Sequence, residues 1–433
     1  MIPRSALDNL FFLLESAQTP MHFGALVQLG AGAEPERIRR LLSHRAARVP
    51  TLRLVAAGDG WATQRRLHTS ALIEPRRITG DAALRRFIDE RMGQPLPSGE
   101  PAWHIDIIQN DVDGRVSLLV RMHHALADGV AASRLLASLA DPQHRARARP
   151  KRPRDSRHGT GARHATTLGE VAAQLDGIAT WFAPHTPFNR RVTSQRTLAW
   201  QPLSQGKIHE AARRLHASPN DVAVAACAGG LRAYLRGLHA LPARSLVAAL
   251  PISLHLRDGG GQGNRLAGMT CQLGTDLRNS SARLHLIRRQ TFRAHRRHLE
   301  GRPHALMDLT AWLPATGVRA AAGLLALTPI ADRFTPLFNL VITHVPGIAD
   351  TFTLGGADIE AIYPFTPLFH GIGLTLALFG CGPTLGLGLT GCPATTPHLW
   401  QLSRAVREAL DELLDAARSA GSGNSDARPG PGC

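Results

Sequence analysis

Cysteine, lysine and acidic residues are all scarce in this chain of 433 residues. The two lysines contribute little to its 50 basic residues, and with only 33 acidic residues the formal net charge is +17. We attribute part of this excess of arginine to GC-rich coding. The cysteines are too few and too scattered for a disulfide framework, and no Cys-x-x-Cys pair occurs, which argues against a zinc ribbon and a thioredoxin-like site. This usage fits a reducing, cytoplasmic compartment. The five cysteines are Cys227, Cys271, Cys381, Cys392 and Cys433.

Long hydrophobic runs are also lacking. The apolar run Leu10–Leu14 near the start is short and has an acid on each side, so it does not read as a secretory signal. Residues 361–403 contain no Asp, Glu, Lys or Arg, but glycine and proline interrupt them, and the longest largely apolar run is Leu374–Phe379. A membrane-spanning helix needs about 20 apolar residues. We therefore predict buried β-structure here, with a hairpin turn at Gly380–Thr384.

What the chain does contain is enough apolar material for a packed core, since 44% of its residues are hydrophobic and 19% are charged. This composition excludes global disorder and a collagen-like or coiled-coil protein. The apolar periodicity mixes helices with strands. Predicted helices cover Ala6–Glu15, Glu34–Val49, Val130–Ala140, Thr167–Phe182, Lys207–Ala217, Asp221–Leu238 and Arg283–Leu299, and predicted strands cover Phe23–Leu29, Val116–Met122, Leu246–Leu250 and Phe338–Thr343.

Two predicted helices carry start signals. Ser5 and Asp8 have the spacing of a capping box. The last helix is predicted to have Thr396 as its N-cap and Pro397 in its first position. Its helical stripe of apolar residues consists of Leu399, Leu402, Val406, Leu410, Leu413 and Leu414.

Composition also divides the chain. Residues 142–166 carry eight basic residues against one acid, together with three prolines, which is typical of an exposed linker. A lipid or nucleic-acid contact is the alternative, although this block lacks the interleaved aromatic residues that a single-strand binder uses. We expect an N-terminal domain over residues 1–141, a basic linker over 142–166, a C-terminal domain over 167–418 and a disordered tail over 419–433.

The sharpest motif is Arg-Met-His-His-Ala-Leu-Ala-Asp-Gly at residues 121–129. The end of the preceding strand places an imidazole at the rim of a sheet. The turn brings Asp128 back near the end of that strand, and Gly129 has no side chain, so backbone or substrate can approach closely. An imidazole is a natural general base near neutral pH. A helix N-cap at Asp128 with two structural histidines, or a metal site, are the alternatives. Adjacent strand residues point to opposite faces, which disfavours one shared metal and leaves only His123 or His124 facing a cavity.

This H-H-x-x-x-D-G motif is the signature of CoA-dependent acyltransferases with the chloramphenicol-acetyltransferase-like fold. Outside the linker and tail, the whole chain resembles the bacterial wax ester synthase/diacylglycerol acyltransferase family. It departs from that family in Thr343–Ile348, where His344 and Ile348 replace an Asn and a Pro, and in lacking a Pro-Leu-Trp element after the first-domain helix. The further resembling segments are Leu7–His22, Asn220–Arg232, Pro251–Leu254, Gly263–Arg265, Val345–Gly347, Tyr363–Pro364 and Gly371.

The resemblance implies an α/β protein of two similar domains, with mixed sheets, flanking helices and a tunnel between the domains. It implies acyl-CoA as co-substrate with no cofactor or metal, and a long-chain alcohol or diacylglycerol as acceptor. It also implies association with the inner membrane face or a lipid-droplet surface, and no nucleic-acid partner. His124 would be the general base, supported by His123, Asp128 and Gly129. A thioester is already activated, so no acyl-enzyme is needed, and no G-x-S-x-G motif occurs.

Other residues have weaker signals. Thr343 is a candidate oxyanion donor or a buried strand-end threonine. Asn220 and Asp221 are expected to support the site or to cap a helix, and Asn264 is a weaker candidate. The six arginines of Arg283–Leu299 suit the phosphates of CoA or a solvated face. The competing functions are a same-fold enzyme that takes a carrier-bound acyl donor and a non-catalytic, arginine-rich lipid- or nucleic-acid-binding protein.

Overall fold

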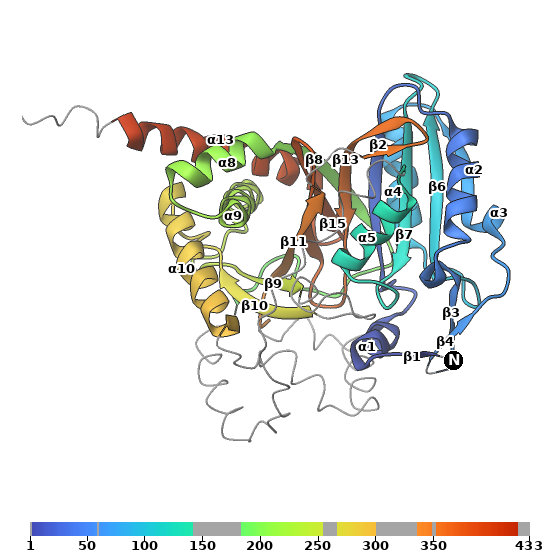
Figure 1. Ribbon diagram of the computed structural model, residues 1–433. Coiled ribbons are helices and arrows are strands. Elements are labelled where there is room, and N and C mark those ends of the chain that lie inside the picture. Colours follow the sequence, from blue (N-terminus) through green and yellow to red (C-terminus); the bar gives the residue numbers. More distant parts are fainter. Residues whose placement is uncertain are drawn as a thin grey trace, which may run out of the picture.

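The computed structural model describes residues 2–58, 60–141, 183–253, 266–299, 336–348 and 352–422 (Figure 1). The predicted linker at 142–166, the predicted helix at 167–182 and Asn264 lie outside these residues. Two six-stranded sheets stand side by side, each with helices on its outer side, and a small three-stranded sheet lies near the N-terminus. Among the described residues, no helix is both long and apolar enough to cross a membrane.

The first sheet has the strand order β12-β13-β2-β7-β6-β5. It is mixed, because β5 runs parallel to β6 while the other neighbours are antiparallel. Its strands are β2 (His22–Leu29), β5 (Ile73–Ile78), β6 (Trp103–Asn110), β7 (Val116–His123), β12 (Thr353–Leu354) and β13 (Ala357–Phe365). Around it lie α1 (Ala6–Leu14), α2 (Pro35–Ala46), η1 (Pro50–Arg53), α3 (Thr69–Leu72), α4 (Asp81–Gly93), α5 (Gly129–Leu139) and the small sheet of β1 (Ile2–Pro3), β4 (Gly60–Thr63) and β3 (Leu54–Ala57).

The second sheet has the order β10-β9-β11-β14-β15-β8, in which β11 runs parallel to both β9 and β14. Helices of the second half cover its side away from the first sheet (Figure 1). The strands are β8 (Thr197–Ser204), β9 (Val247–Ser253), β10 (Leu266–Gln272), β11 (Leu340–Ile348), β14 (Leu374–Cys381) and β15 (Thr384–Gly391), and the helices are α8 (Gln205–Arg214), α9 (Pro219–Gly237), α10 (Ser280–Leu299) and α13 (Leu399–Ser422).

The uncharged segment is β-structure, as predicted. It contains the second half of β13 and the hairpin of β14 and β15, and every residue of β14 is buried. A composition-based division of the chain does not anticipate where β13 lies, because this strand pairs with β2 and completes the first sheet. The two halves of the chain therefore share a sheet as well as an interface.

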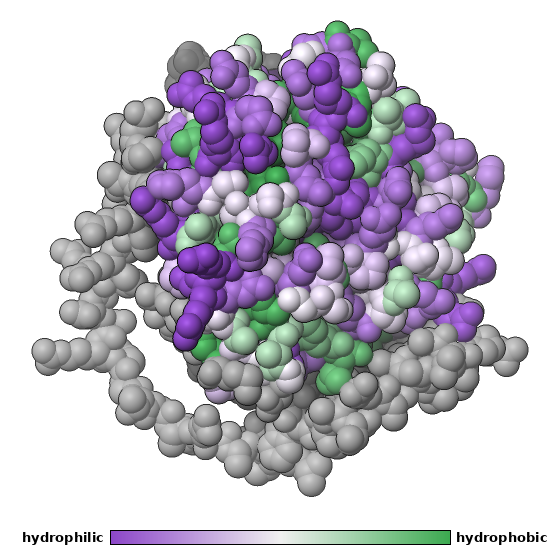
Figure 2. All heavy atoms as spheres, turned by 90° about the vertical axis from the view of Figure 1, so that its right-hand side faces the viewer, coloured by the Kyte–Doolittle hydropathy of each residue, from purple (hydrophilic) through white to green (hydrophobic). Residues whose placement is uncertain are grey.

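The sheets approach each other closely where β15 crosses β13. A Cβ atom on Gly386 would overlap the carbonyl oxygen of Ile362, and one on Gly388 would overlap that of Pro364. Glycine at these positions lets the two backbones meet with no side chain between them. The outer face over the first sheet is mostly hydrophilic with scattered apolar residues (Figure 2), which is normal for a solvated surface.

The predicted start of the last helix is wrong. The hydroxyl of Thr396 donates a hydrogen bond to the Cys392 carbonyl oxygen at 2.8 Å instead of capping a helix. His398 has a φ of 55°, which interrupts helical geometry, so α13 begins at Leu399. The helix also continues to Ser422, and residues 419–422 are therefore not part of a disordered tail. The predicted apolar stripe is confirmed, since its six residues are buried in the core of the second half.

Candidate active site

The two-histidine motif forms the connection between β7 and α5. The strand ends at His123, and Asp128 is the N-cap of the helix, where its buried side chain accepts a hydrogen bond from the Ala131 N–H at 2.8 Å. The sequence predicts that a turn follows the strand and that Asp128 can cap the next helix, and both features are confirmed.

His123 is buried and holds this turn. Its Nδ1 accepts a hydrogen bond from the Ala125 N–H at 3.1 Å, which requires the proton of the neutral ring to be on Nε2. That Nε2 lies 3.4 Å from a carboxylate oxygen of Glu15. The ring also stacks on Phe12, with centroids 4.2 Å apart. These contacts fit a structural support rather than the reacting group.

His124 is partly exposed and lies just beyond the strand, in the turn. Its backbone N–H donates to the Met21 carbonyl oxygen at 2.8 Å. Its ring stacks on Phe11 at 4.2 Å and meets the edge of Phe23 at 5.6 Å. The prediction that the two histidines face opposite sides of a strand applies to residues within the strand, and His124 lies one residue beyond its end. The two rings contact different residues of α1, Phe12 for His123 and Phe11 for His124.

The environment of His124 keeps its ring neutral at physiological pH. The pKa of His124 is lowered to about 4, mainly by burial and to a lesser extent by the charge of the neighbouring His123. A backbone hydrogen bond and the carboxylates of Asp128 and Asp8 act in the opposite direction and limit this decrease. A neutral imidazole next to two carboxylates can accept a proton and then be stabilised as imidazolium.

Gly129 brings this loop against the second half of the molecule. A Cβ atom at Gly129 would lie only 2.7 Å from Cγ2 of Val345 on β11. The absence of a side chain therefore allows the start of α5 to contact β11 directly. The motif consequently lies where the two halves meet, as expected from the sequence.

An apolar pocket of about 90 Å³ begins at the same junction. It runs between the first sheet and α5, and Gly129 and Val345 line it together with Phe23, the aromatic residue that contacts His124. Its other walls include Met122, Leu136 and Phe379. The lining is almost entirely hydrocarbon, so the pocket suits an aliphatic chain.

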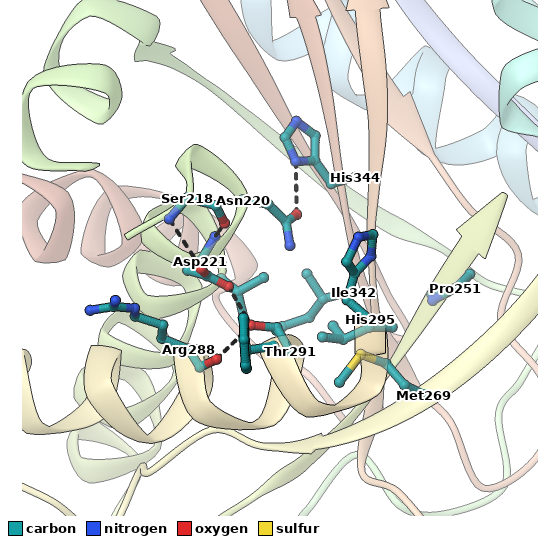
Figure 3. Close-up of a pocket in the computed structure, with 13 residues that line it drawn as sticks. Ser218, Asn220, Asp221, Pro251, Met269, Arg288, Thr291, His295, Ile342 and His344 are labelled. Atoms are coloured by element: carbon teal, nitrogen blue, oxygen red, sulfur yellow. Dashed lines mark hydrogen bonds between the residues drawn. The ribbon is translucent and has the colours of Figure 1, made fainter. Parts of the chain in front are cut away.

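Thr343 lies on β11, two residues before Val345. Side chains alternate along a strand, which places Thr343 on the same face as Val345, toward the first half. His344, between them, lies on the opposite face, where it lines a larger pocket of about 510 Å³ (Figure 3). β11 therefore separates the two pockets.

Asn220 and Asp221 line this larger pocket at the start of α9 (Figure 3). Asp221 forms a capping box with Ser218 and accepts a hydrogen bond from the Thr291 hydroxyl at 2.7 Å, so its contacts are those of a capping residue. The Oδ1 of Asn220 lies 2.9 Å from Nδ1 of His344. The sequence predicts Asn220 as a residue of the site but gives no sign of this partner, which is 124 positions away along the chain.

Among the described residues, Glu74, His104 and Asp106 bring three potential metal-ligating atoms within 4.8 Å of one another. Arginines already pair with these carboxylates, since Arg76 contacts Glu74 and Asp106, and Arg91 lies 3.1 Å from Asp106. Burial would raise the pKa of Asp106, but His104 and Arg91 lower it to about 2. The group forms an ion-pair cluster beside α4.

Replacement of Asp128 separates its capping role from its charge. An asparagine side chain at this position would still cap α5, whereas alanine would remove the cap and lower the free energy of unfolding by about 1 kcal/mol. We expect Asp128→Asn to keep the urea midpoint and lower kcat, because it no longer stabilises the His124 imidazolium. Unfolding curves and steady-state kinetics of Asp128→Asn and Asp128→Ala measure the two effects. Wild-type kcat in Asp128→Asn would limit Asp128 to capping.

Comparison with known proteins agrees with this arrangement. The model of the wax ester synthase/diacylglycerol acyltransferase catalytic domain matches residues 5–181, and that of the family's C-terminal domain matches residues 262–414. A Mycobacterium tuberculosis protein whose name assigns it provisionally to the diacylglycerol O-acyltransferases is 30% identical over 98% of this chain and 92% of its own. The chain belongs to this family. The family predicted from the sequence is thus confirmed.

Solved structures confirm the fold of this family member. The wax ester synthase/diacylglycerol acyltransferase of Marinobacter aquaeolei VT8 superposes with a TM-score of 0.72 at 23% identity, over 96% of this chain and all of that one. The starter condensation domain of rhizomide synthetase, solved with C8-CoA and Leu-SNAC, has a TM-score of 0.59 at 18% identity over 96% and 94% of the two chains. The predicted two-domain α/β architecture with mixed sheets is correct.

Several residues of the site have no obvious sequence signal. Phe11 and Phe12 contact the two histidines from α1, and Glu15 follows that helix. Only the family-like segment Leu7–His22 pointed to this region. A helix that supplies aromatic rings to a motif more than 100 residues away cannot be identified from local periodicity.

Proposed function

We propose that the protein is an acyl-CoA-dependent O-acyltransferase. It moves a long-chain acyl group to a fatty alcohol or to diacylglycerol and gives a wax ester or triacylglycerol. The observation that carries this proposal is the position of His124, a partly exposed residue with a neutral imidazole at the junction of the two halves, beside an apolar pocket.

In the proposed reaction His124 accepts the proton of the acceptor hydroxyl. The alcohol oxygen attacks the thioester carbonyl carbon, forming the C–O bond and a tetrahedral oxyanion. The C–S bond then breaks, and the thiolate of CoA takes the proton back from the imidazolium. The carboxylates of Asp128 and Asp8 stabilise the imidazolium between these two transfers. His123 and Gly129 hold the loop in place through the contacts described above.

The oxyanion needs a donor that is already in position. We propose the Thr343 hydroxyl for this role, because the alternation along β11 turns it toward the half that carries His124. Binding both substrates in one junction supplies the remaining rate gain through orientation.

The apolar pocket, with a volume of about 90 Å³, is proposed to hold part of the acyl chain. Ala132 lines it from α5, so Ala132→Phe would shorten the space for a long chain. We expect KM to rise about tenfold for palmitoyl-CoA and to change little for butyryl-CoA. Arg134→Phe, at an exposed position of the same helix, is the matched control. Equal effects on both donors in Ala132→Phe would place the chain elsewhere.

The function is tested with purified protein, palmitoyl-CoA and a panel of hexadecanol and dioleoylglycerol, with CoA release and ester formation as readouts. We expect turnover with at least one acceptor. No turnover with any long-chain acceptor would contradict the proposal. Turnover only when the acyl group is offered on a carrier protein would favour the alternative, an enzyme of the same fold that uses a carrier-bound acyl donor. The starter condensation domain of rhizomide synthetase shares this fold.

Contact with an anionic lipid surface is part of this proposal. The net charge of +17 attracts such surfaces, and the acceptors are membrane lipids or fatty alcohols. Co-sedimentation with vesicles containing phosphatidylglycerol measures this contact, and binding that persists unchanged at high salt would contradict its electrostatic origin.

A further inference from the structure

A third pocket lies at another contact between the two halves, on the side of the first sheet that carries α4. We call it the α4 pocket, and its volume is about 230 Å³. The first half contributes the sheet and α4, and the second half contributes Trp200 from β8 and Trp400 from α13. Ser117 lines the α4 pocket, whereas its neighbour Leu118 lines the apolar pocket near His124. Adjacent strand residues point to opposite faces, so the first sheet separates these two pockets.

The floor of the α4 pocket is polar and carries no charge. Gln28 and Ile108 are the direct neighbours of Ser117 on the two adjoining strands, so all three lie side by side on one face. Asn110 follows two residues after Ile108 and lies on the same face. The Tyr363 hydroxyl donates a hydrogen bond to Oε1 of Gln28 at 3.3 Å, which orients this amide. Within the described residues, the NH2 of Gln28 has no acceptor and is available to a ligand.

Two further polar groups of the floor have unused hydrogen-bonding capacity. The Oδ1 of Asn110 accepts hydrogen bonds from the N–H groups of Gly80 and Val112 at 2.9 and 3.2 Å, which leaves its NH2 with no acceptor in the described part of the chain. Ser117 is buried, and none of the described residues forms a hydrogen bond with its hydroxyl. Polar groups in such positions usually have a partner. The floor therefore offers two amide donors and a hydroxyl to a polar ligand.

The side walls of the α4 pocket are aromatic. Trp200 and Trp400 are half-buried, and their ring centroids lie 4.8 Å apart with the planes at 69°. The guanidinium of Arg85 lies over the Trp400 ring, 4.0 Å from its centroid, which holds Arg85 at the mouth of the pocket. Indole rings present a large apolar surface next to polar groups. The walls thus suit a ligand that has C–H groups as well as hydroxyl groups.

The charges at the mouth cancel. The charged residues that line the α4 pocket are two acids and two arginines, although the whole chain has 50 basic and 33 acidic residues. Asp113 pairs with Arg115, whose backbone N–H donates to Oδ1 of Asp113 at 3.1 Å. Asp81, at the start of α4, supplies carboxylate acceptors, and Arg85 supplies donors. A mouth without a field of one sign does not concentrate phosphates or cations, so it favours a neutral ligand.

We propose that the α4 pocket binds a neutral sugar residue. The sugar hydroxyls accept hydrogen bonds from the amides of Gln28 and Asn110 and donate to Asp81, while the C–H groups of the ring pack on Trp200. A volume of about 230 Å³ suits one six-membered sugar ring and is small for a nucleotide. The ligand contacts both halves and lies on the far side of the sheet from the apolar pocket, so this site is independent of the proposed function.

Binding of free hexoses tests the site in the intact protein. Glucose, mannose and galactose are the probes, and saturation-transfer NMR and tryptophan fluorescence are the readouts. Two of the six tryptophans line the pocket, so a bound sugar should change the fluorescence. We expect saturable binding of at least one hexose and a higher thermal midpoint in its presence. Saturable binding of none of the three, or equally tight binding of inorganic phosphate, would overturn the proposal.

Matched variants locate the bound sugar. Gln28→Ala and Ser117→Ala should each weaken hexose binding about three- to tenfold, as expected for the loss of one hydrogen bond. Gln109→Ala is the control, because Gln109 is also half-buried in the first sheet but does not line the α4 pocket. Urea midpoints check that the three variants fold. Wild-type binding in both pocket variants, or equal weakening in Gln109→Ala, would refute the assignment of the sugar to this pocket.

Discussion

Replacing His124 with alanine is expected to abolish ester formation. A positioned general base contributes a factor of about 10² to 10⁴ to the rate, so kcat should fall by at least about a hundredfold. His124 is a partly exposed residue in a turn, and its ring stacks on Phe11, so the variant should remain folded. CoA release from palmitoyl-CoA with hexadecanol measures kcat, and circular dichroism checks the fold.

A second histidine replacement controls for general effects. His209→Ala removes an exposed imidazole on α8, in the second half of the chain, and should leave kcat unchanged. Wild-type turnover in His124→Ala would refute the assignment of the base. Loss of turnover in both variants would indicate an unspecific effect.

The pH dependence of the same reaction gives an independent test. Burial lowers the pKa of His124 to about 4, so the ring is the neutral base throughout the neutral range. We expect kcat to be constant between about pH 6 and 8 and to decrease as the pH falls through about 4. In the unfolded chain the pKa of His124 is about 6.5, its ordinary value. Between about pH 4 and 6.5 the unfolded chain therefore binds a proton at His124 that the folded protein does not, so the free energy of unfolding should rise with pH over this range. A kcat transition centred at pH 6.5 would contradict the lowered pKa of His124.

Gly388→Ala is expected to have the largest effect on stability. Its Cβ would overlap the Pro364 carbonyl oxygen, and a backbone atom of a neighbouring strand cannot rotate out of the way as a side chain can. The two sheets would have to separate locally, at a cost of about 3 kcal/mol or more, as for other severe overpacking. Urea unfolding of wild type and variant measures the difference in midpoint.

Gly237→Ala provides the control. Gly237 ends α9 and has no atom within 4 Å of its added Cβ, so alanine should be neutral or slightly stabilising there. Similar midpoints for Gly388→Ala and Gly237→Ala would show that the contact between β15 and β13 can relax.

The sequence allowed the local elements of the site to be predicted. The capping box of Ser5 and Asp8, the strand that leads into the two histidines, and the capping role of Asp128 follow from neighbouring residues. The resemblance to the family added the fold. These features depend on interactions within one or two turns of the chain, which a single sequence encodes directly.

Features that depend on distant segments could not be predicted in this way. The pairing of β13 with β2 and the contact of His344 with Asn220 join residues that the chain separates widely. Thr396 was misassigned because its hydroxyl finds a carbonyl acceptor in the preceding turn, although Thr-Pro is a common helix start. The contact of His124 with α1 depends on where the strand ends, to within one residue.

The pairing of β13 with β2 has a consequence for synthesis of the protein on the ribosome. Until residues 357–365 have emerged, β2 is an edge strand with unpaired backbone groups and a buried-type side-chain pattern. Such an edge is prone to pair with other chains. The nascent first half therefore has this edge open to such pairing for the time that translation of more than 200 further residues takes.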